Sequence, residues 1–383
     1  MRAKAPRIRP AGSVAGVSHD GAVGGASGQP SLMAAYLGVI CDLDGVVYRG
    51  PDAIPYAVSA LNDVSRLRPL CFATNNASRT PGEVATQLRS LGLTVEDAAV
   101  VTSAQAGAQL LAAELPSGSA VLAVGGPGVP AALAAVGLVV TREPEEARAV
   151  LQGWGRDVRV DDLARAAVAI AHGARWVATN TDRTLPTPQG LVPGNGTLVS
   201  AVAEATGREP EVVGKPHAPL YLAAAERLAA APELLLAVGD RLDTDIIGAT
   251  AVGADSLWVL GGVDGFLSLV GSPARPTYAA HDLRALLDPP VRVERLDPAS
   301  WACGDVRLSI VSGRVSAAAD GVTIDMSAVP GNQLAALAAT VVLDLRGQSA
   351  SYDLAVSLAT EFDRVLGHSA GVNRHRVEDT RPQ

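Results

Sequence analysis

The stretch ICDLDGVVYRG, residues 40–50, places two carboxylates, Asp42 and Asp44, in a segment whose other side chains read as a buried strand. Residues two apart in a strand leave the backbone on the same side. Burying an ionised carboxylate costs several kcal/mol even after relaxation, so these two need a positive partner. Gly45 marks the end of the predicted strand. The stretch therefore predicts a strand whose carboxyl end carries a charged site.

From Leu37 onward, short apolar runs alternate with longer helical patterns. This rhythm indicates βαβ units and an α/β fold with a doubly wound, mostly parallel sheet. In such sheets, ligands bind beyond the carboxyl ends of the strands. The runs predicted as strands are LGVICDLDG, RPLCFATNN, AAVVTS, SAVLAVGG, ARAVLQGW, ARWVATNTD, EVVGK, LLLAVGDRLDTD and DSLWVL.

Polar residues at the ends of other predicted strands complete the charged site. They are Thr74 and Asn75 after the second run, Lys215 after EVVG, and Asp240 and Asp245 after LLLAV. A domain is stable by only about 5–15 kcal/mol, so converging buried carboxylates require a cation. Oxygen ligands without His or Cys select Mg²⁺ rather than zinc or copper. We therefore expect Mg²⁺ where these carboxylates meet.

The same residues can carry out phosphoryl transfer. A carboxylate such as Asp42 can attack phosphorus and form an acyl phosphate. Asp44 can pass a proton to the leaving oxygen and later take one from the attacking water. Mg²⁺ and Lys215 would supply positive charge to the equatorial oxygens, and Thr74 and the amides after it can donate hydrogen bonds.

Four motifs, DLDGVVY, TNNAS, VVGKP and GDRLDTD, resemble in order and spacing those of the haloacid-dehalogenase superfamily. The match is closest to the branch of small-molecule phosphatases with a large α/β cap. That branch contains the NagD-like, 4-nitrophenyl phosphate, phosphoglycolate and glycerol-phosphate phosphatases. The resemblance covers roughly residues 37 to 285.

The resemblance implies a role for each matching residue. It makes Asp42 the nucleophile, Asp44 the acid/base, and Lys215 the group that neutralises the nucleophile and the phosphate. The metal would be held by the side chain of Asp42, the backbone carbonyl of Asp44 and the side chain of Asp240, with Asp245 supporting the metal shell. An alternative for Asp245 is a helix cap. The phosphate would be held by Thr74, Asn75 and Asn76.

The cap is the insertion between the second and third motifs, residues 114–210. It contains TNTDRTLPTPQGLVPGNGTLV, residues 179–199, a loop dense in Gly and Pro that is typical of a lid or a substrate-facing element. From this loop, Asn180, Asp182 and Arg183 are predicted to face the substrate, with a structural turn as the alternative. The loop has no aromatic residue on which a ring could stack. A short polyol phosphate therefore fits better than a nucleotide. The family resemblance implies glycerol 3-phosphate as the substrate, with nucleotides, phosphoglycolate and pyridoxal phosphate as alternatives.

The rest of the chain is assigned by composition. The expected parts are a disordered extension over 1–33, a phosphatase core over 34–113 and 211–288, a C-terminal α+β module over 291–370 and a tail over 371–383. In the module, residues 306–326 predict two antiparallel strands, and residues 332–367 predict a helix, a strand and a helix. The module resembles a truncated acetyltransferase-like domain without the loop that cradles coenzyme A. We expect a structural or regulatory role for it.

Composition limits the classes of binding partner. The formal net charge of −8 argues against nucleic acid, and no apolar run approaches the ~20 residues that a spanning helix needs. Cys41, Cys71 and Cys303 form no CxxC pair and are expected to be reduced core residues in the cytoplasm. The expected partners are a small phosphorylated metabolite and, by resemblance, a second copy of the chain in a homodimer.

Other functions fit the sequence less well. A mutase of the superfamily would have to exclude water, and the large α/β cap argues against it. Dehalogenation does not need Asp44. A phosphate-binding sensor or scaffold is the non-enzymatic alternative, and the intact motifs argue against it.

Overall fold

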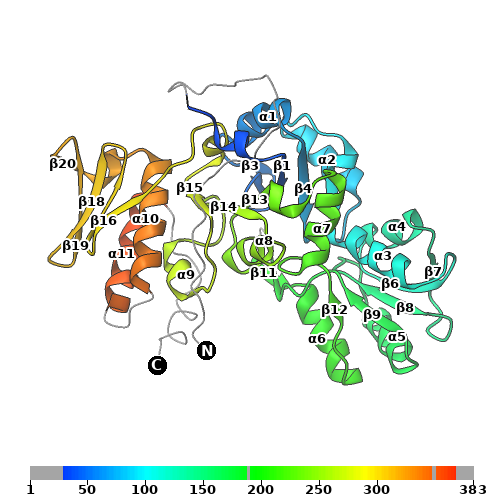
Figure 1. Ribbon diagram of the computed structural model, residues 1–383. Coiled ribbons are helices and arrows are strands. Elements are labelled where there is room, and N and C mark those ends of the chain that lie inside the picture. The colour runs from blue at the N-terminus through cyan, green and yellow to red at the C-terminus, as the bar shows by residue number, and fades with distance from the viewer. Residues whose placement is uncertain (1–28, 188–189, 347–350, 368–383) are drawn as a thin grey trace, which may run out of the picture.

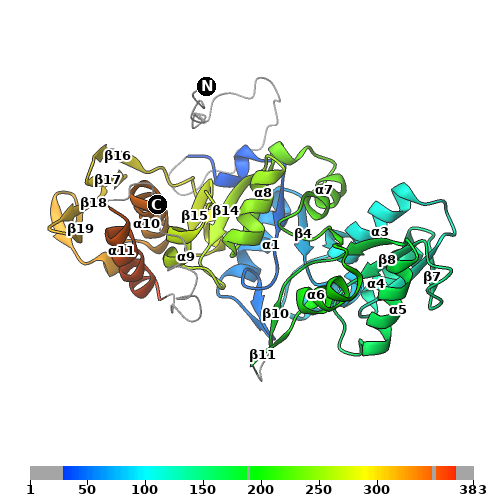
Figure 2. The ribbon, with the colours of Figure 1, turned by 90° about the horizontal axis from the view of Figure 1, so that it is seen from below.

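The computed structural model describes residues 29–187, 190–346 and 351–367, which form a core, a cap and a C-terminal module. The core lies in the middle, with the cap at one end of the molecule and the module at the other (Figures 1 and 2). The chain leaves the core for the cap through α3 (Ser103–Glu114) and returns after β12 (Glu211–Val212). Among the described residues, no helix is long and apolar enough to cross a membrane.

The core is a six-stranded sheet whose neighbouring strands are all parallel. Its order is β15 (Tyr278–Ala280), β14 (Asp255–Val259), β13 (Leu235–Gly239), β1 (Gly38–Cys41), β4 (Leu70–Thr74) and β5 (Val100–Thr102). The chain winds outward from β1 in both directions, so the order of winding reverses between β1 and β13. This arrangement confirms the predicted doubly wound sheet and puts its ligand position at that reversal.

Helices cover both faces of the core sheet because side chains alternate along β1. Val39 and Cys41 point to one face, which is covered by α1 (Ala57–Leu67), α2 (Pro81–Ser90) and η5 (Leu283–Leu286). Ile40 points to the other face, which is covered by α3, α7 (Ala218–Arg227) and α8 (Ile247–Ala251). All four residues of β1 are buried, as expected for a central parallel strand.

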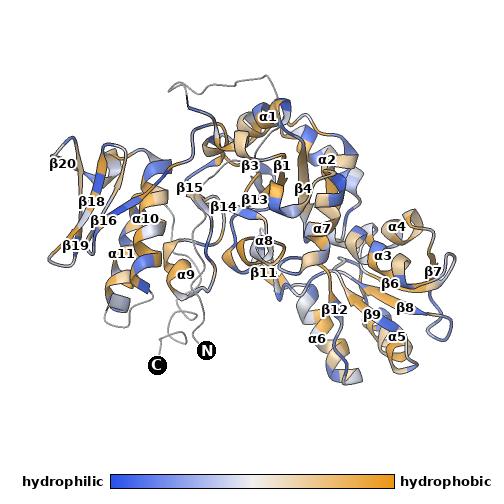
Figure 3. Ribbon diagram, viewed as in Figure 1, coloured by the Kyte–Doolittle hydropathy of each residue, from blue (hydrophilic) through white to orange (hydrophobic). Residues whose placement is uncertain are grey.

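The cap contains a second parallel sheet, in the order β12, β9 (Arg175–Ala178), β8 (Ala149–Gln152), β6 (Ala120–Val124) and β7 (Val139–Thr141). Its strands β6 and β8 are hydrophobic for much of their length (Figure 3). One face packs against α5 (Val160–Ala171) and α6 (Asn195–Thr206), and the other against α3 and α4 (Gly128–Ala135).

The segment 179–199, predicted as a loop, forms an antiparallel hairpin of β10 (Thr184–Thr187) and β11 (Gly190–Pro193) and then the start of α6. The loop prediction was wrong here because a two-stranded ribbon tolerates Pro. Neither strand needs the missing proline N–H for a second neighbour. The hairpin extends from the main body of the molecule (Figure 2).

The C-terminal module is a five-stranded antiparallel sheet with two helices. Its strands are β16 (Glu294–Asp297), β17 (Ser300–Cys303), β18 (Val306–Val311), β19 (Arg314–Ala319) and β20 (Val322–Ile324). The helices are α10 (Gly331–Arg346) and α11 (Tyr352–Val365). The two predicted strands are confirmed as β18 and β19, but the strand predicted between the helices is wrong. Val341 and Val342 lie buried inside α10, where packing outweighs the weak β preference of valine.

Short elements complete the chain. They are η1 (Leu32–Ala35), β2 (Tyr48–Arg49), β3 (Asp52–Ala53), η2 (Asp97–Ala99), η3 (Pro232–Leu234), η4 (Leu242–Ile246), α9 (Phe266–Gly271) and η6 (Met326–Ala328). Leu32 and Met33 are buried, and the Leu32 N–H donates to the carbonyl of Asp288, so the folded chain begins before residue 34. Residues 1–28 of the extension predicted over 1–33, and the tail predicted over 371–383, lie outside the described residues.

Candidate active site

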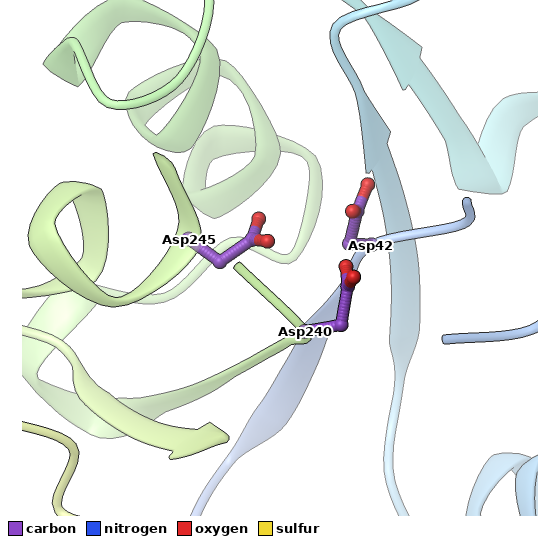
Figure 4. A group of neighbouring side chains, drawn as sticks. All are labelled: Asp42, Asp240 and Asp245. Carbon is purple, nitrogen blue, oxygen red and sulfur yellow. The ribbon is translucent and has the colours of Figure 1, made fainter. Parts of the chain in front are cut away.

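Three carboxylates meet at the carboxyl end of the core sheet (Figure 4). Asp42 and Asp240 directly follow β1 and β13, which are parallel neighbours with Cys41 opposite Val238. Asp245 comes from η4, a π-helical turn between β13 and α8. One oxygen from each carboxylate lies within 4.8 Å of the others. The parallel register of two neighbouring strands therefore creates this group.

The ammonium of Lys215 lies in the same place. Its Nζ is 2.6 Å from Oδ1 of Asp42 and 2.7 Å from Oδ1 of Asp245, and Lys215 is only 6% exposed. Asn75 holds the backbone that carries this lysine, since its Oδ1 accepts from the Lys215 N–H at 2.8 Å and its Nδ2 donates to the Lys215 carbonyl at 3.1 Å. Lys215 is thus fixed beside the carboxylate of Asp42.

The charges of this group shift one another's pKa values. Burial raises the pKa of Asp42 to about 7, with Lys215 opposing the shift and Asp245 adding to it. Burial also raises the pKa of Asp240, and the nearby carboxylates of Asp245 and Asp42 raise it further. Burial disfavours the charge of Lys215, but the carboxylates of Asp245 and Asp42 outweigh burial and raise its pKa. Negative charge is therefore in excess here.

The excess charge fits a divalent cation. Among the described residues, two of the three carboxylates, Asp42 and Asp245, share the ammonium of Lys215. Oδ2 of Asp240 accepts from the Val263 N–H at 2.8 Å, whereas its buried Oδ1 has no hydrogen-bond partner in the described chain. Leaving a buried carboxylate oxygen unpaired is costly. Carboxylate oxygens converging without His or Cys suit Mg²⁺.

Asp245 accepts from its own turn as well as from Lys215. Its Oδ2 accepts from the Arg241 N–H at 3.1 Å, while α8 begins two residues later and is preceded by Ile246 at its N-cap position. The helix-cap alternative for Asp245 is therefore not what the structure has. Asp245 instead links Lys215 to the turn after β13.

Asp44 lies apart from the three carboxylates. The prediction that the strand continues to Gly45 was wrong, because β1 ends at Cys41 and the carbonyl of Leu43 accepts from the Val47 N–H at 2.8 Å. Gly45 has a φ of +86°, which coils the backbone back toward β2. The Asp44 side chain reaches solvent, but the surrounding protein raises its pKa by desolvation, with Arg79 and Lys215 acting against the shift.

The predicted phosphate residues form a turn after β4. Thr74 is 2% exposed, and its Oγ1 accepts from the Asn76 N–H at 3.1 Å. Oδ1 of Asn76 accepts from the N–H of Ser78 at 3.0 Å. Asn75, as described above, engages the Lys215 backbone. Thr74 and Asn76 therefore shape the turn, and Asn75 positions Lys215.

The three predicted cap residues separate in the structure. Asn180 donates from Nδ2 to the carbonyl of Asn75 at 2.8 Å. Asp182 lies 3.8 Å from Nη1 of Arg241, and its Oδ2 accepts from Nδ2 of Asn75 at 3.4 Å. The side chain of Arg183 is exposed. Asn180 and Asp182 therefore connect the cap to the core, and Arg183 is the one left in solvent.

Sequence reasoning missed the loop that follows β14, residues 260–265. Its Val263 N–H donates to Asp240, and a Cβ at Gly262 would lie 1.6 Å from Oδ2 of the same carboxylate. Only glycine fits this approach. The pair Gly261 and Gly262 directly after an apolar strand was the available signal.

Comparisons with known proteins show the family of the chain. The family model of the haloacid dehalogenase-like hydrolases matches residues 39–139, and a second haloacid dehalogenase hydrolase-like model matches residues 212–286. The D-glycerol 3-phosphate phosphatase of Mycobacterium tuberculosis is 49% identical over 251 residues, which are 65% of this chain and 70% of that protein. The chain belongs to the haloacid dehalogenase-like hydrolases, in their phosphatase branch.

Other relatives of this haloacid dehalogenase-like phosphatase extend the comparison. The acid sugar phosphatase of Staphylococcus haemolyticus is 34% identical, over 67% of this chain and 97% of that protein. The crystal structure of the M. tuberculosis glycerol phosphate phosphatase in complex with magnesium has a TM-score of 0.68 at 41% identity, covering 78% of this chain and 89% of that one. NagD from Escherichia coli K-12 has a TM-score of 0.60 at 31% identity, covering 65% and 97%. The expected family and branch are confirmed.

Proposed function

We propose that this chain hydrolyses small phosphomonoesters with Mg²⁺, through an aspartyl phosphate on Asp42. The observation that carries the proposal is the contact of Asp42 with the buried Lys215 ammonium, 2.6 Å away, at the reversal of the core sheet. A nucleophilic carboxylate needs a positive neighbour, because the phosphate that it attacks is itself negative. Lys215 provides that neighbour.

Each step has a residue to perform it. The carboxylate of Asp42 attacks phosphorus, forming the bond to phosphate while the bond to the leaving oxygen breaks. Asp44 gives its proton to that oxygen; desolvation raises the pKa of Asp44, with Arg79 and Lys215 acting against the shift. In the second step Asp44 takes a proton from water, which attacks the phosphorus and releases Asp42. Lys215 offsets the negative charge throughout.

The metal would be held by Asp42, the backbone carbonyl of Asp44 and Asp240, with Asp245 as support. When bound, Mg²⁺ supplies positive charge to the phosphate oxygens and balances the excess carboxylates. The unpaired Oδ1 of Asp240 supports this assignment. The similar M. tuberculosis enzyme was crystallised with magnesium.

Glycerol 3-phosphate is the substrate that we propose. The relative that is 49% identical is a D-glycerol 3-phosphate phosphatase. The cap segment 179–199, which contains the hairpin, offers hydroxyls, amides and Arg183 but no aromatic ring on which a base or pyridoxal could stack. A short polyol phosphate suits such a surface. Acid sugar phosphatases are also among the relatives, which keeps other small polar esters as competitors.

The test compares kcat/KM for glycerol 3-phosphate, phosphoglycolate, UMP and pyridoxal phosphate in one buffer with Mg²⁺. We expect glycerol 3-phosphate to be preferred. A nucleotide or pyridoxal phosphate that wins by about tenfold, or about 1.4 kcal/mol of transition-state binding, would contradict the substrate assignment. The variant Arg183→Ala tests the cap segment separately: an unchanged substrate ranking and KM would remove Arg183 from the substrate site. Phosphate binding without turnover would favour the sensor or scaffold alternative.

We also propose the domain limits, compartment and oligomeric state expected from the sequence. The expected limits are residues 34–113 and 211–288 for the core, 114–210 for the cap and 291–370 for the module. The core also includes the buried Leu32 and Met33, and β12 at residues 211–212 pairs with the cap sheet. Three buried free cysteines suit the reducing cytoplasm. The net charge of −8 suits a small metabolite partner rather than nucleic acid.

Light scattering after size-exclusion chromatography tests the proposed homodimer, and a measured mass of one chain would contradict it.

A further inference from the structure

The C-terminal module shares one hydrophobic core with the segment behind the active site. That core includes Trp258 of β14 and Phe266 of α9 together with Phe362 of α11. The ring centroids of Trp258 and Phe266 are 5.3 Å apart, and those of Phe266 and Phe362 are 5.9 Å apart, both edge to face. Helices α9, α10 and α11 lie side by side (Figures 1 and 2). The module is therefore packed directly onto α9.

Both ends of α9 are held by charged residues of the module. At its start, Oδ1 of Asp363 accepts from the Phe266 N–H at 2.8 Å, and Oδ2 accepts from the Leu267 N–H at 3.1 Å. At its end, Arg346 donates to the carbonyls of Leu269, Ser272 and Ala274. Asp363 is 2% and Arg346 is 8% exposed, so water does not compete for these bonds. The position of α9 is therefore set by the module.

The start of α9 is three residues from a contact with Asp240. The loop 260–265 joins β14 to α9, and its Val263 N–H donates to Oδ2 of Asp240 at 2.8 Å. The next residue, Asp264, accepts from the Leu242 N–H at 2.8 Å, in the turn after β13. The indole N–H of Trp258 donates to the carbonyl of Asp240 at 3.0 Å. Side chain and backbone of Asp240 are thus both held by residues that pack on α9 or lead into it.

We propose that the C-terminal module positions Asp240 for magnesium, with Asp363 as the positioning residue. The Val263 N–H fixes Oδ2 of Asp240, so Oδ1 remains the oxygen that can bind the metal. Residues that orient a ligand typically change metal affinity by about 10–100-fold when mutated, and Asp363 acts one step further away. This inference rests on the proposed function, because it takes Asp240 as a metal ligand. It gives the module a part in metal binding.

The test is a calorimetric titration of the full-length, metal-depleted chain with MgCl₂ and no substrate. We expect Asp363→Ala to raise the dissociation constant by about three- to tenfold, below the range for a residue in direct contact with the ligand. Asp363→Asn keeps one acceptor and should lie between Asp363→Ala and the parent. The matched control is Asp282→Ala, which removes another buried carboxylate that accepts from a backbone N–H, that of Arg284 at 3.0 Å. Its magnesium affinity should equal that of the parent.

Thermal midpoints without Mg²⁺, recorded for every variant, separate stability from affinity. Equal dissociation constants for Asp363→Ala and the parent would overturn the proposal, as would an equal loss in Asp282→Ala. If Asp363→Ala does not fold, unchanged binding in both Asp363→Asn and Arg346→Lys overturns it. Two other outcomes would refute the metal assignment of the proposed function, and the positioning role with it. The first is that the parent chain shows no measurable Mg²⁺ binding, and the second is that Asp240→Ala binds Mg²⁺ as tightly as the parent.

Discussion

The Nζ atom of Lys215 lies 2.6 Å from Oδ1 of Asp42, and the side chains are 4% and 12% exposed. The two residues are far apart in sequence, and Asn75 holds the lysine backbone in place from a third strand end. Because water does little to stabilise either charge here, removing one partner leaves the other charge buried without compensation. The contact therefore links the stability of the site to its chemistry.

Removing the lysine charge should destabilise the fold. Lys215→Met leaves Asp42 and Asp245 buried without their ammonium, and such a loss typically costs about 3–5 kcal/mol. Urea unfolding in excess chelator measures it. Arg66→Met breaks an exposed ion pair to Asp63 and should cost less than about 1 kcal/mol. Equal losses in the two variants would show that Lys215 does not neutralise a buried cluster.

Neutralising Asp240 should raise the stability of the metal-free protein but reduce the stability that the protein gains from Mg²⁺. Asp240→Asn keeps an oxygen for the Val263 N–H but removes one of three buried charges. Without metal we expect a gain in stability of about 1–2 kcal/mol. The parent should gain about 2.7 kcal/mol from Mg²⁺ at a hundred times its dissociation constant, and the variant much less. Thermal midpoints in chelator and in Mg²⁺ measure both, and an equal Mg²⁺ gain would contradict the metal assignment.

Much of the fold could be predicted because its central strands are long apolar runs. Each run predicted as a strand between Leu37 and Leu260 contains one in the structure, from β1 to β14. The edge strands β7 and β15 were missed, because β7 is largely exposed and β15 has no β-branched residue. The strand predicted at Val341 and Val342 was wrong because short β-branched runs also occur in buried helices, where tertiary packing determines the secondary structure.

The site could be predicted only in part. Asp42 and Asp240 follow neighbouring strands of the core sheet, and a parallel sheet brings such strand ends together whatever the loops do. Lys215 follows β12 of the cap sheet, and its backbone is held beside Asp42 by Asn75. Asn180 and Asp182 lie in the irregular segment between β9 and β10, whose direction no local pattern specifies, and they contact Asn75 and Arg241. The confirmed family and phosphatase activity followed from the four motifs.

Stability should depend on pH through His281, which lies between β15 and the end of α11. Its hydrogen bond to Asp282 raises its pKa, so the folded protein holds the proton more tightly than the unfolded chain. The stabilisation is full below the ordinary value of about 6.5 and is lost as pH rises through the folded pKa. His281 is 41% exposed, so the effect should stay below about 1 kcal/mol.

The measurement is urea unfolding of the parent and His281→Gln between about pH 5 and 9, a range that brackets the ordinary histidine value. Their difference in unfolding free energy should shrink as the pH rises. The exposed His172, changed to Gln, is the control. A difference that grows with pH would give the wrong sign.

Changing Asp182 to Ala should weaken the contact between the cap and the core. This removes the contacts with Arg241 and Asn75, which are partly exposed and so worth about 0.5–1 kcal/mol. We expect kcat/KM to fall about two- to fivefold with the fold intact. Asp161→Ala breaks an ion pair within α5 of the cap and serves as the control. Equal kinetics in both variants would mean that the Asp182 contact does not matter for turnover.

The most direct measurement is acid quenching of the enzyme during turnover of phosphate-labelled glycerol 3-phosphate, followed by mass spectrometry of its peptides. We expect phosphate on Asp42 of the parent. In Asp42→Asn, which should fold but lose several kcal/mol of barrier lowering, we expect no label and turnover reduced at least about a thousandfold. A phosphate on any other residue, or turnover of Asp42→Asn within about tenfold of the parent, would contradict Asp42 as the nucleophile.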